Sequence, residues 1–352
     1  MPSQAQFAPA DVAPTDIPIR AIDFAPVDLV RTDAADGSIL LSTRDSLAPH
    51  EPSLVRVFRA AVETAPARIF LAERWGERWR TITYEEARRE VDAIAAALIE
   101  RGLSAERPVM ILSGNAIDHA LLALGAITAG VPVAPISAAY SLQSQDHQNL
   151  KYIFDILSPG LVYVSDTALF ARALAALDLS GTEVVATANG AGIENVTPFT
   201  ALTSTSPGPA LDAAAAGIGP DSIAKILFTS GSTGMPKGVI NTHRMLTANQ
   251  QAIVQVWPFL QEQPLVLVDW LPWNHTFGGN HNFNMVLRNA GSLYIDAGKP
   301  VPALVGETVR NLSEVSPIVY FNVPAGYAAL LPYLERDDGL ARSFFARLRL
   351  IF

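Results

Sequence analysis

The stretch from residue 225 to residue 239 combines residue types that suit the binding of a phosphate group. It opens with an apolar run, Ile226 to Phe228, whose length is typical of a buried strand. Residues 229–234 contain only threonine, serine and glycine, so backbone amides and small hydroxyls are accessible there. Successive amides in such a turn form a concavity that suits an anion, and Lys237 adds a positive charge. The pattern predicts a phosphate-binding loop.

The residues alone leave one alternative and exclude another. A Gly- and Ser-rich stretch can be a surface turn between a strand and a helix. A Walker loop is excluded, because Lys237 follows Pro236 instead of Gly and precedes Gly238 where Ser or Thr belongs. An unrelated α/β NTPase, which would need a Walker loop, is disfavoured for the same reason.

The complete string from Phe228 to Gly238 resembles the phosphate-binding signature of the adenylate-forming superfamily. This superfamily includes acyl-CoA synthetases, luciferases and the adenylation domains of peptide synthetases. Its signature reads aromatic-Thr-Ser-Gly-(Ser/Thr)-Thr-Gly-x-Pro-Lys-Gly, and every constrained position matches here. The resemblance implies that Lys237 acts in catalysis. It also implies that the ATP-binding residues are Thr229, Ser230, Gly231, Ser232, Thr233, Gly234 and Lys237.

A second motif, Asp269-Trp-Leu-Pro-Trp-Asn-His-Thr-Phe-Gly-Gly-Asn280, leaves an apolar run and enters a glycine-rich turn. Ligands of open α/β sheets bind at the carboxyl ends of strands, so both motifs are expected to face one crevice. The motif resembles the superfamily's Pro-(x)-x-His-x-(aromatic)-Gly. The resemblance implies that His275 lies beside the acyl carboxylate as a catalytic and substrate-binding residue, and that Phe277 lines the acyl pocket. His281 falls one helical turn further and is expected to face the same pocket.

Core packing is the alternative for several of these side chains. A histidine in an apolar motif is commonly a buried, hydrogen-bonded core residue, and for His281 both interpretations stay open. Phe277 can be plain core, while Trp270 and Trp273 are expected to pack in the core or at its rim. Asn322 resembles a family position near the nucleotide pocket.

The resemblance implies an acid-thiol ligase that uses ATP, coenzyme A and Mg²⁺, with the Mg²⁺ ligand expected beyond residue 352. A carboxylate attacks the α-phosphate of ATP to give an acyl-adenylate and pyrophosphate, and the coenzyme A thiol then displaces AMP. Fixed donors and a cation suit the charge that develops on pyrophosphate. Residues 241–298 look most like feruloyl-CoA synthetases of aromatic-acid catabolism. A ferulate-like hydroxycinnamate is therefore the expected substrate, and another aryl or fatty carboxylate is the alternative.

The composition is that of a globular enzyme. Of 352 residues, 49% are hydrophobic and 17% charged, and the formal net charge is −9. An acidic chain without a Lys/Arg block lacks the basic face that nucleic acid needs. The chain has no cysteine, hence neither a disulfide framework nor a thiolate nucleophile. No apolar run reaches the ~18 residues of a membrane span, and the first residues lack a secretion signal, so a cytoplasmic enzyme is expected.

Apolar runs alternate with helical patterns, which indicates mostly parallel sheets covered by helices. We expect an α/β fold with two stacked αβ subdomains, residues 51–190 and 221–352, as in the N-terminal domain of adenylate-forming enzymes. Residues 1–50 are expected to form an irregular arm over a later domain, and residues 191–220 a linker. Two local elements are also predicted, a β-hairpin over 69–82 and a helix-capping box over 83–86.

The resemblance covers about residues 50–352 and only the first part of a family member. The Tyr-Gly-x-Thr-Glu motif, the ribose-binding Asp, the hinge and the C-terminal domain with its adenylation Lys are expected beyond residue 352. An N-terminal portion of a ligase, truncated before the C-terminal domain and inactive or severely impaired alone, is therefore expected. The hypothesis of a different class is a catalytically silent fragment that binds acyl ligand or phosphate weakly.

Overall fold

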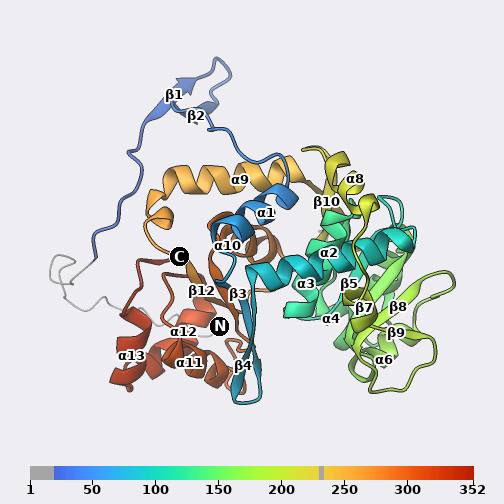
Figure 1. Ribbon diagram of the computed structural model, residues 1–352. Helices are drawn as coiled ribbons and strands as arrows, with labels where there is room; N and C mark the ends of the chain where they lie inside the picture. Colours follow the sequence, from blue (N-terminus) through green and yellow to red (C-terminus); the bar gives the residue numbers. More distant parts are fainter. Residues whose placement is uncertain (1–19, 230–233) are drawn as a thin grey trace.

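A computed structural model describes residues 20–229 and 234–352. The predicted loop residues Ser230, Gly231, Ser232 and Thr233 lie outside the described residues. Two main sheets, of seven and four strands, form the frame of the molecule. In Figure 1 the strands β5, β7 and β8 lie toward one end of the molecule, and the helices α11 and α13 lie at the other.

The seven-stranded sheet has the order β11-β10-β6-β5-β7-β8-β9, and every neighbouring pair is parallel except β10 with β11. Its central strand β5 is a continuous apolar run that is buried along its whole length, as expected for a parallel strand covered on both faces. The mostly parallel α/β fold is therefore confirmed. The strands are β5 (Val109–Leu112), β6 (Val133–Pro135), β7 (Leu161–Asp166), β8 (Glu183–Ala188), β9 (Val196–Pro198), β10 (Ile223–Thr229) and β11 (Lys237–Thr242).

The four-stranded sheet has the order β12-β13-β3-β4. The pairs β12–β13 and β13–β3 are parallel, and β3 with β4 forms the predicted antiparallel hairpin, in which Trp75 pairs with Arg78. The predicted capping box follows directly, since Glu86 N donates to Thr83 and Thr83 N donates to the Glu86 carboxylate. The strands are β3 (Ile69–Trp75), β4 (Arg78–Thr83), β12 (Val266–Asp269) and β13 (Ser292–Ile295); a further parallel pair joins β14 (Val319–Tyr320) to β15 (Leu350–Ile351).

Helices fill the space between the sheets and cover their outer faces. Val109 and Ile111 of β5 pack in the core shared with α1, α2, α3 and α10, while Met110 and Leu112 pack against α5 and α6. Val268 of β12 packs on α11, α12 and α13. The helices are α1 (Leu54–Thr64), α2 (Tyr84–Glu100), α3 (Ile117–Thr128), α4 (Ala138–Leu142), α5 (Gln148–Leu157), α6 (Thr167–Ala175), α7 (Thr200–Thr203), α8 (Pro209–Gly217), α9 (His243–Val256), α10 (Phe283–Arg288), α11 (Val305–Glu314), α12 (Pro324–Leu334) and α13 (Asp338–Phe345).

The two sheets do not follow the expected division of the chain at residues 191–220. β10 and β11 follow that segment and yet extend the seven-stranded sheet through β6, while β3 and β4 precede it and extend the four-stranded sheet through β13. Residues 51–190 and 221–352 therefore each contribute strands to both sheets. The apolar pattern predicts where a strand lies in the sequence. It does not predict the neighbouring strand, because that depends on which sheet edge is free in the folded chain.

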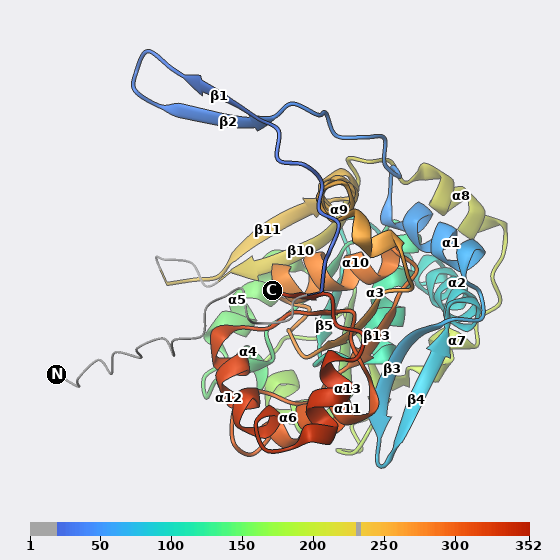
Figure 2. The same cartoon turned by 90° about the vertical axis from the view of Figure 1, so that its left-hand side faces the viewer.

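The expected arm and linker contain short regular elements. Residues 29–43 form an antiparallel hairpin, β1 (Leu29–Asp33) with β2 (Ile39–Thr43), which stands away from the rest of the molecule (Figures 1 and 2). The flanks of this hairpin contact later elements, because Phe24 packs edge-on against Phe259 and Ala48 N donates to Gln255. Residues 191–220 contain β9, α7 and α8.

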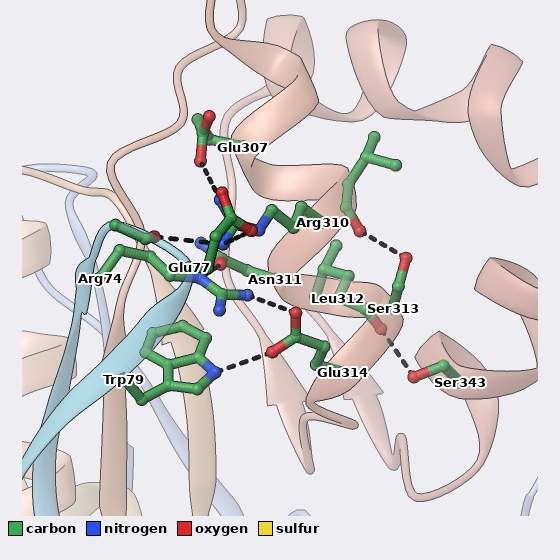
Figure 3. Close-up of polar contacts among 12 residues, drawn as sticks. Arg74, Glu77, Trp79, Glu307, Arg310, Asn311, Leu312, Ser313, Glu314 and Ser343 are labelled. Atoms are coloured by element: carbon green, nitrogen blue, oxygen red, sulfur yellow. Dashed lines mark hydrogen bonds and ion pairs between the residues drawn. The ribbon is translucent and has the colours of Figure 1, made fainter.

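Polar contacts attach the β3–β4 hairpin to α11 (Figure 3). Arg74 Nε donates to Asn311 Oδ1 at 2.8 Å, and Arg74 Nη2 lies 2.8 Å from Glu314. The Arg74 guanidinium also lies 3.9 Å from the centre of the Trp79 ring, whose Nε1 donates to Glu314 at 2.9 Å. These contacts fix the edge strand β4 to the helix that covers its sheet.

Candidate active site

The predicted phosphate loop connects two antiparallel strands. β10 leads into it and β11 leaves it, with Phe228 opposite Gly238 and Thr229 opposite Lys237. The segment therefore joins two strands and not a strand and a helix, while phosphate binding stays a prediction. The strand β11 was not predicted from the sequence. Pro236 and Gly238 are unfavourable in strands, and the β-branched run that follows them, Val239–Ile240, is short.

The described ends of the loop carry the groups expected there. Gly234 has a φ of +111°, a conformation that favours glycine. The side chains of Thr229 and Lys237 are exposed opposite each other at the end of the hairpin. A hydroxyl and an ammonium group in this position fit the anionic oxygens of a nucleotide.

The second motif forms a close turn followed by a π-helix. β12 ends at Asp269, and the π-helix η3 (Phe277–Asn282) runs directly into α10. A Cβ on Gly278 would meet the carbonyl oxygens of Leu271 and Pro272, and one on Gly279 would meet that of Trp273. Glycine is therefore required at both positions so that the π-helix can pack on the preceding turn. π-Turns of this kind are frequent at functional sites.

Phe277 and His281 lie together in an aromatic cluster, formed by Trp257, Phe277, His281, Phe321 and Phe352. The ring centres of Phe277 and His281 are 5.5 Å apart, and His281 lies 5.1 Å from Phe321. The residues of this cluster come from α9's end, the π-helix and the ends of β14 and β15, so the fold gathers them from separate segments.

His275 is exposed and has no ring contact with the cluster among the contacts of the described residues. The amide of Phe277 donates to His275 Nδ1 at 3.3 Å. Nδ1 is therefore an acceptor, and the proton of the neutral imidazole is on Nε2. His275 thus offers an N–H donor at the surface, which suits a carboxylate.

A buried hydrogen-bonded chain fixes the other histidine in the opposite tautomer. Asn282 Nδ2 donates to Asp269 Oδ2 at 2.9 Å, so Asn282 Oδ1 must be the acceptor for His281 Nδ1, 2.8 Å away. The proton of His281 is then on Nδ1, and Nε2 is an acceptor. Burial lowers the pKa of His281, partly offset by its bond with Asn282, so the imidazole is neutral at pH 7.

Asp269 and Asn282 were missed as site residues. Both side chains are buried, and burial raises the pKa of Asp269 to about 7. The carboxylate also accepts from Leu271 N at 3.0 Å, which fixes the start of the turn. The only available signal was a polar residue directly after an apolar strand.

The tryptophans and Asn322 have packing roles in the structure. Trp273 is buried and packs edge-on against Phe283 and His119. Trp270 Nε1 donates to Asn322 Oδ1 at 3.1 Å, and Asn322 Nδ2 donates to the Tyr320 hydroxyl. Asn322 therefore ties the second motif to β14; its placement near a nucleotide remains an expectation.

Lys225, at the start of the first motif, was given no role by the sequence analysis. It lies in β10 with only 7% of its surface exposed, and its Nζ donates to Gly279 O at 2.9 Å. The strand that leads to the phosphate loop is thereby bonded to the π-helix that carries Phe277 and His281.

Residues 20–229 and 234–352 contain no group of three or more His, Cys, Asp or Glu side chains that could hold a metal ion. That the Mg²⁺ ligand lies beyond residue 352 stays a prediction. Within the same ranges, no helix combines the length and the apolar character that crossing a bilayer requires.

The chain is similar in sequence and in fold to known proteins. The chain matches the AMP-binding enzyme family over residues 58–352. Long-chain-fatty-acid–CoA ligase ACSBG2 of Mus musculus is 26% identical over 326 residues, covering 89% of this chain and 47% of the mouse protein. ATP-bound MatB from Rhodopseudomonas palustris has a TM-score of 0.60 at 23% identity, over 84% of this chain and 54% of that chain. A benzoate CoA ligase from Burkholderia xenovorans LB400 has a TM-score of 0.62 at 20% identity, over 79% and 52%.

The fold is that of the N-terminal domain of adenylate-forming enzymes, with the signature loop at the end of a sheet hairpin. The chain belongs to the AMP-binding enzyme family, whose relatives here include acyl- and aryl-CoA ligases. It spans about half the length of the curated relatives it matches.

Proposed function

We propose that this chain carries the phosphate-binding and acyl-binding parts of an ATP-dependent acid-thiol ligase for an aromatic carboxylate of the ferulate type. The observation that carries the proposal is the pair of opposite histidine tautomers. His275 offers an N–H donor through Nε2, while His281 offers an acceptor through Nε2 within a cluster of aromatic rings. A hydroxycinnamate has the matching groups, a carboxylate at one end, a planar ring and a phenolic hydroxyl at the other.

In the proposed first step, a carboxylate oxygen attacks the α-phosphate and the bond to the bridging oxygen of pyrophosphate breaks. Lys237 and the donors of residues 229–234 hold the phosphates and stabilise the charge that develops on pyrophosphate. His275 orients the carboxylate through Nε2–H. In the second step, the coenzyme A thiol attacks the acyl carbonyl, AMP leaves, and the thiol proton passes to solvent.

The resemblance of residues 241–298 to feruloyl-CoA synthetases supports the aromatic substrate. The relative named as a long-chain-fatty-acid–CoA ligase favours a fatty carboxylate as the second candidate. A catalytically silent binding protein is the third, because the activity of whole relatives is carried by chains about twice as long.

The test is AMP release from ATP with coenzyme A, using ferulate, cinnamate, benzoate and dodecanoate in parallel. The assay is run on the 352-residue chain and on the product of the reading frame continued past Phe352. We expect release with ferulate to exceed release with cinnamate, which lacks the hydroxyl. Turnover with dodecanoate alone would refute the aromatic substrate and retain the ligase. If ATP binds without AMP release in either protein, the silent binding function is correct.

A further inference from the structure

Lys225 is a buried cation without a carboxylate partner. The ion pairs within the described ranges do not include it. Two histidines feel the Lys225 charge, His119 and His243. Burial, together with that charge, lowers their pKa values to about 4, so both are neutral at pH 7. Burying an ammonium group without a counter-ion is costly, and a strand interior does not require it. The position therefore points to a role other than packing.

The hairpin β10–β11 presents Lys225 on the same face as Lys237. Side chains alternate along a strand, so Lys225 and Thr229 share one face of β10. Their partners on β11 are Asn241 and Lys237, which lie on that face as well. On β11 itself Val239 and Ile240 are exposed, so the polar contact of Asn241 is a candidate for holding this strand against the π-helix. In Figure 2 the strands β10 and β11 lie side by side, to the left of α9.

Lys225 and its partner Asn241 both bond the π-helix, at consecutive residues. Lys225 Nζ donates to Gly279 O at 2.9 Å, and Asn280 Nδ2 donates to Asn241 Oδ1 at 3.0 Å. From the other side, Gln250 Nε2 of α9 lies 3.0 Å from Asn280 O. Side-chain groups from β10, β11 and α9 thus bond the π-helix at neighbouring residues.

We propose that Lys225 and Asn241 are positioning residues that hold the phosphate-loop hairpin at a fixed distance from the π-helix bearing Phe277 and His281. The inference rests on the proposed function, because it assigns the two held elements to the two substrates of one reaction. Lys225 touches neither substrate. It acts by bringing the acyl carboxylate and the α-phosphate into line, and a misplacement of about 1 Å can cost about 100-fold in rate.

The variants isolate this role. Lys225→Met keeps an unbranched apolar side chain that is one heavy atom shorter, and it removes the ammonium group that donates to Gly279 O. Asn241→Leu removes the acceptor for Asn280, whereas Asn241→Asp keeps an acceptor at the same place and is the matched control. Each variant is made in the 352-residue chain and in the continued reading frame.

The first measurement is hydrogen–deuterium exchange, which needs no activity. We expect Lys225→Met and Asn241→Leu to raise exchange at least tenfold in segments 226–229 and 277–283, with Asn241→Asp close to wild type. Unchanged exchange in both segments would overturn the proposed positioning role of Lys225 and Asn241, whether or not the chain is a ligase. If exchange in Lys225→Met rises throughout the chain, that variant is generally unfolded. The comparison of Asn241→Leu with Asn241→Asp then tests the positioning role.

The second measurement is ATP–pyrophosphate exchange with the best carboxylate of the panel. We expect Lys225→Met and Asn241→Leu to lower kcat 10- to 100-fold with the KM values for ATP and carboxylate changed less than threefold, and Asn241→Asp to restore kcat. A raised KM with unchanged kcat would contradict positioning. If the wild type shows no ATP–pyrophosphate exchange while the hydrogen–deuterium result is as expected, the proposed function fails. The positioning role of Lys225 and Asn241 is then retained.

Discussion

His281 donates a hydrogen bond from Nδ1 to Oδ1 of Asn282, 2.8 Å away, and this bond determines which nitrogen of the ring can accept. The amide orientation of Asn282 is in turn set by the buried carboxylate of Asp269. The Asp269 carboxyl group, two hydrogen bonds away from the imidazole, thereby controls which ring nitrogen of His281 can accept a hydrogen bond from a ligand. Asp269, the first link of this chain, gives the most direct test.

Replacing Asp269 should remove one proton from the pH dependence of stability. Burial raises the pKa of Asp269 from 3.8 to about 7, so the folded protein binds a proton that the unfolded chain has released. The contribution is full below about pH 3.8 and is lost as the pH rises through 7, at up to about 1.4 kcal/mol per pH unit. Urea unfolding at pH 5, 6, 7 and 8 gives the free energy of unfolding at each pH. This free energy should fall less steeply with rising pH in Asp269→Asn than in the wild type. The exposed Glu194→Gln is the control, and equal slopes in all three proteins would contradict the assignment.

Replacing Lys237 should impair chemistry and leave the fold intact. The side chain is exposed at the hairpin end, so Lys237→Ala should shift the unfolding free energy by less than about 0.5 kcal/mol. Loss of a charge-assisted hydrogen bond of about 1.5–3 kcal/mol should lower ATP–pyrophosphate exchange about ten- to a hundredfold. Lys151→Ala removes another exposed lysine, on α5, and should change neither quantity. Equal losses in the two variants would indicate a nonspecific charge effect.

Two glycines in helical segments should respond oppositely to alanine. In Gly279→Ala the new Cβ would meet the carbonyl oxygen of Trp273, so the π-helix must move or unfold. We expect a loss of at least about 2 kcal/mol in urea unfolding, in line with severe backbone strain and overpacking. Gly306 of α11 has no atom within 4 Å of a Cβ, and Gly306→Ala should be neutral or stabilising by up to about 1 kcal/mol. A tolerated Gly279→Ala would mean that the close turn is not required.

The two arginines of Figure 3 should differ in their effect on stability. The Arg74 side chain is 8% exposed and bonds the buried Asn311, so Arg74→Met should cost about 1–3 kcal/mol. Arg310 pairs with Glu77, which is 91% exposed, and Arg310→Met should cost less than about 1 kcal/mol. Thermal unfolding of both variants gives the comparison. A larger loss in Arg310→Met would reverse the interpretation of this cluster.

Local patterns predicted the elements, and long-range pairing decided the rest. The hairpin 69–82 and the capping box of Thr83 depend on neighbouring residues, so the sequence contained them. β11 becomes a strand by pairing with β10, and its Gly238 fits because a Cβ there would press on Phe228. The sequence carries no sign of that partner.

The candidate site divides in the same way. A recognisable string predicted the loop and the histidines, since each is contiguous in sequence. The roles of Lys225 and Asp269, by contrast, depend on their hydrogen-bond partners, which are Gly279 and Asn282. Neither contact follows from composition or periodicity, because both depend on how the π-helix packs on the sheet.

The interleaving of the two sheets has a consequence for the order in which the chain can fold. While the chain is being synthesised, one edge of β6 stays unpaired until β10 has been made. The β3–β4 hairpin likewise has no neighbouring strand until β13 has been made. A nascent chain that ends before residue 223 therefore has two unfinished sheets, whose bare edges can pair with other chains. Completion of both sheets depends on contacts between distant parts of the sequence, which makes folding slow and gives chaperones a long period in which to bind.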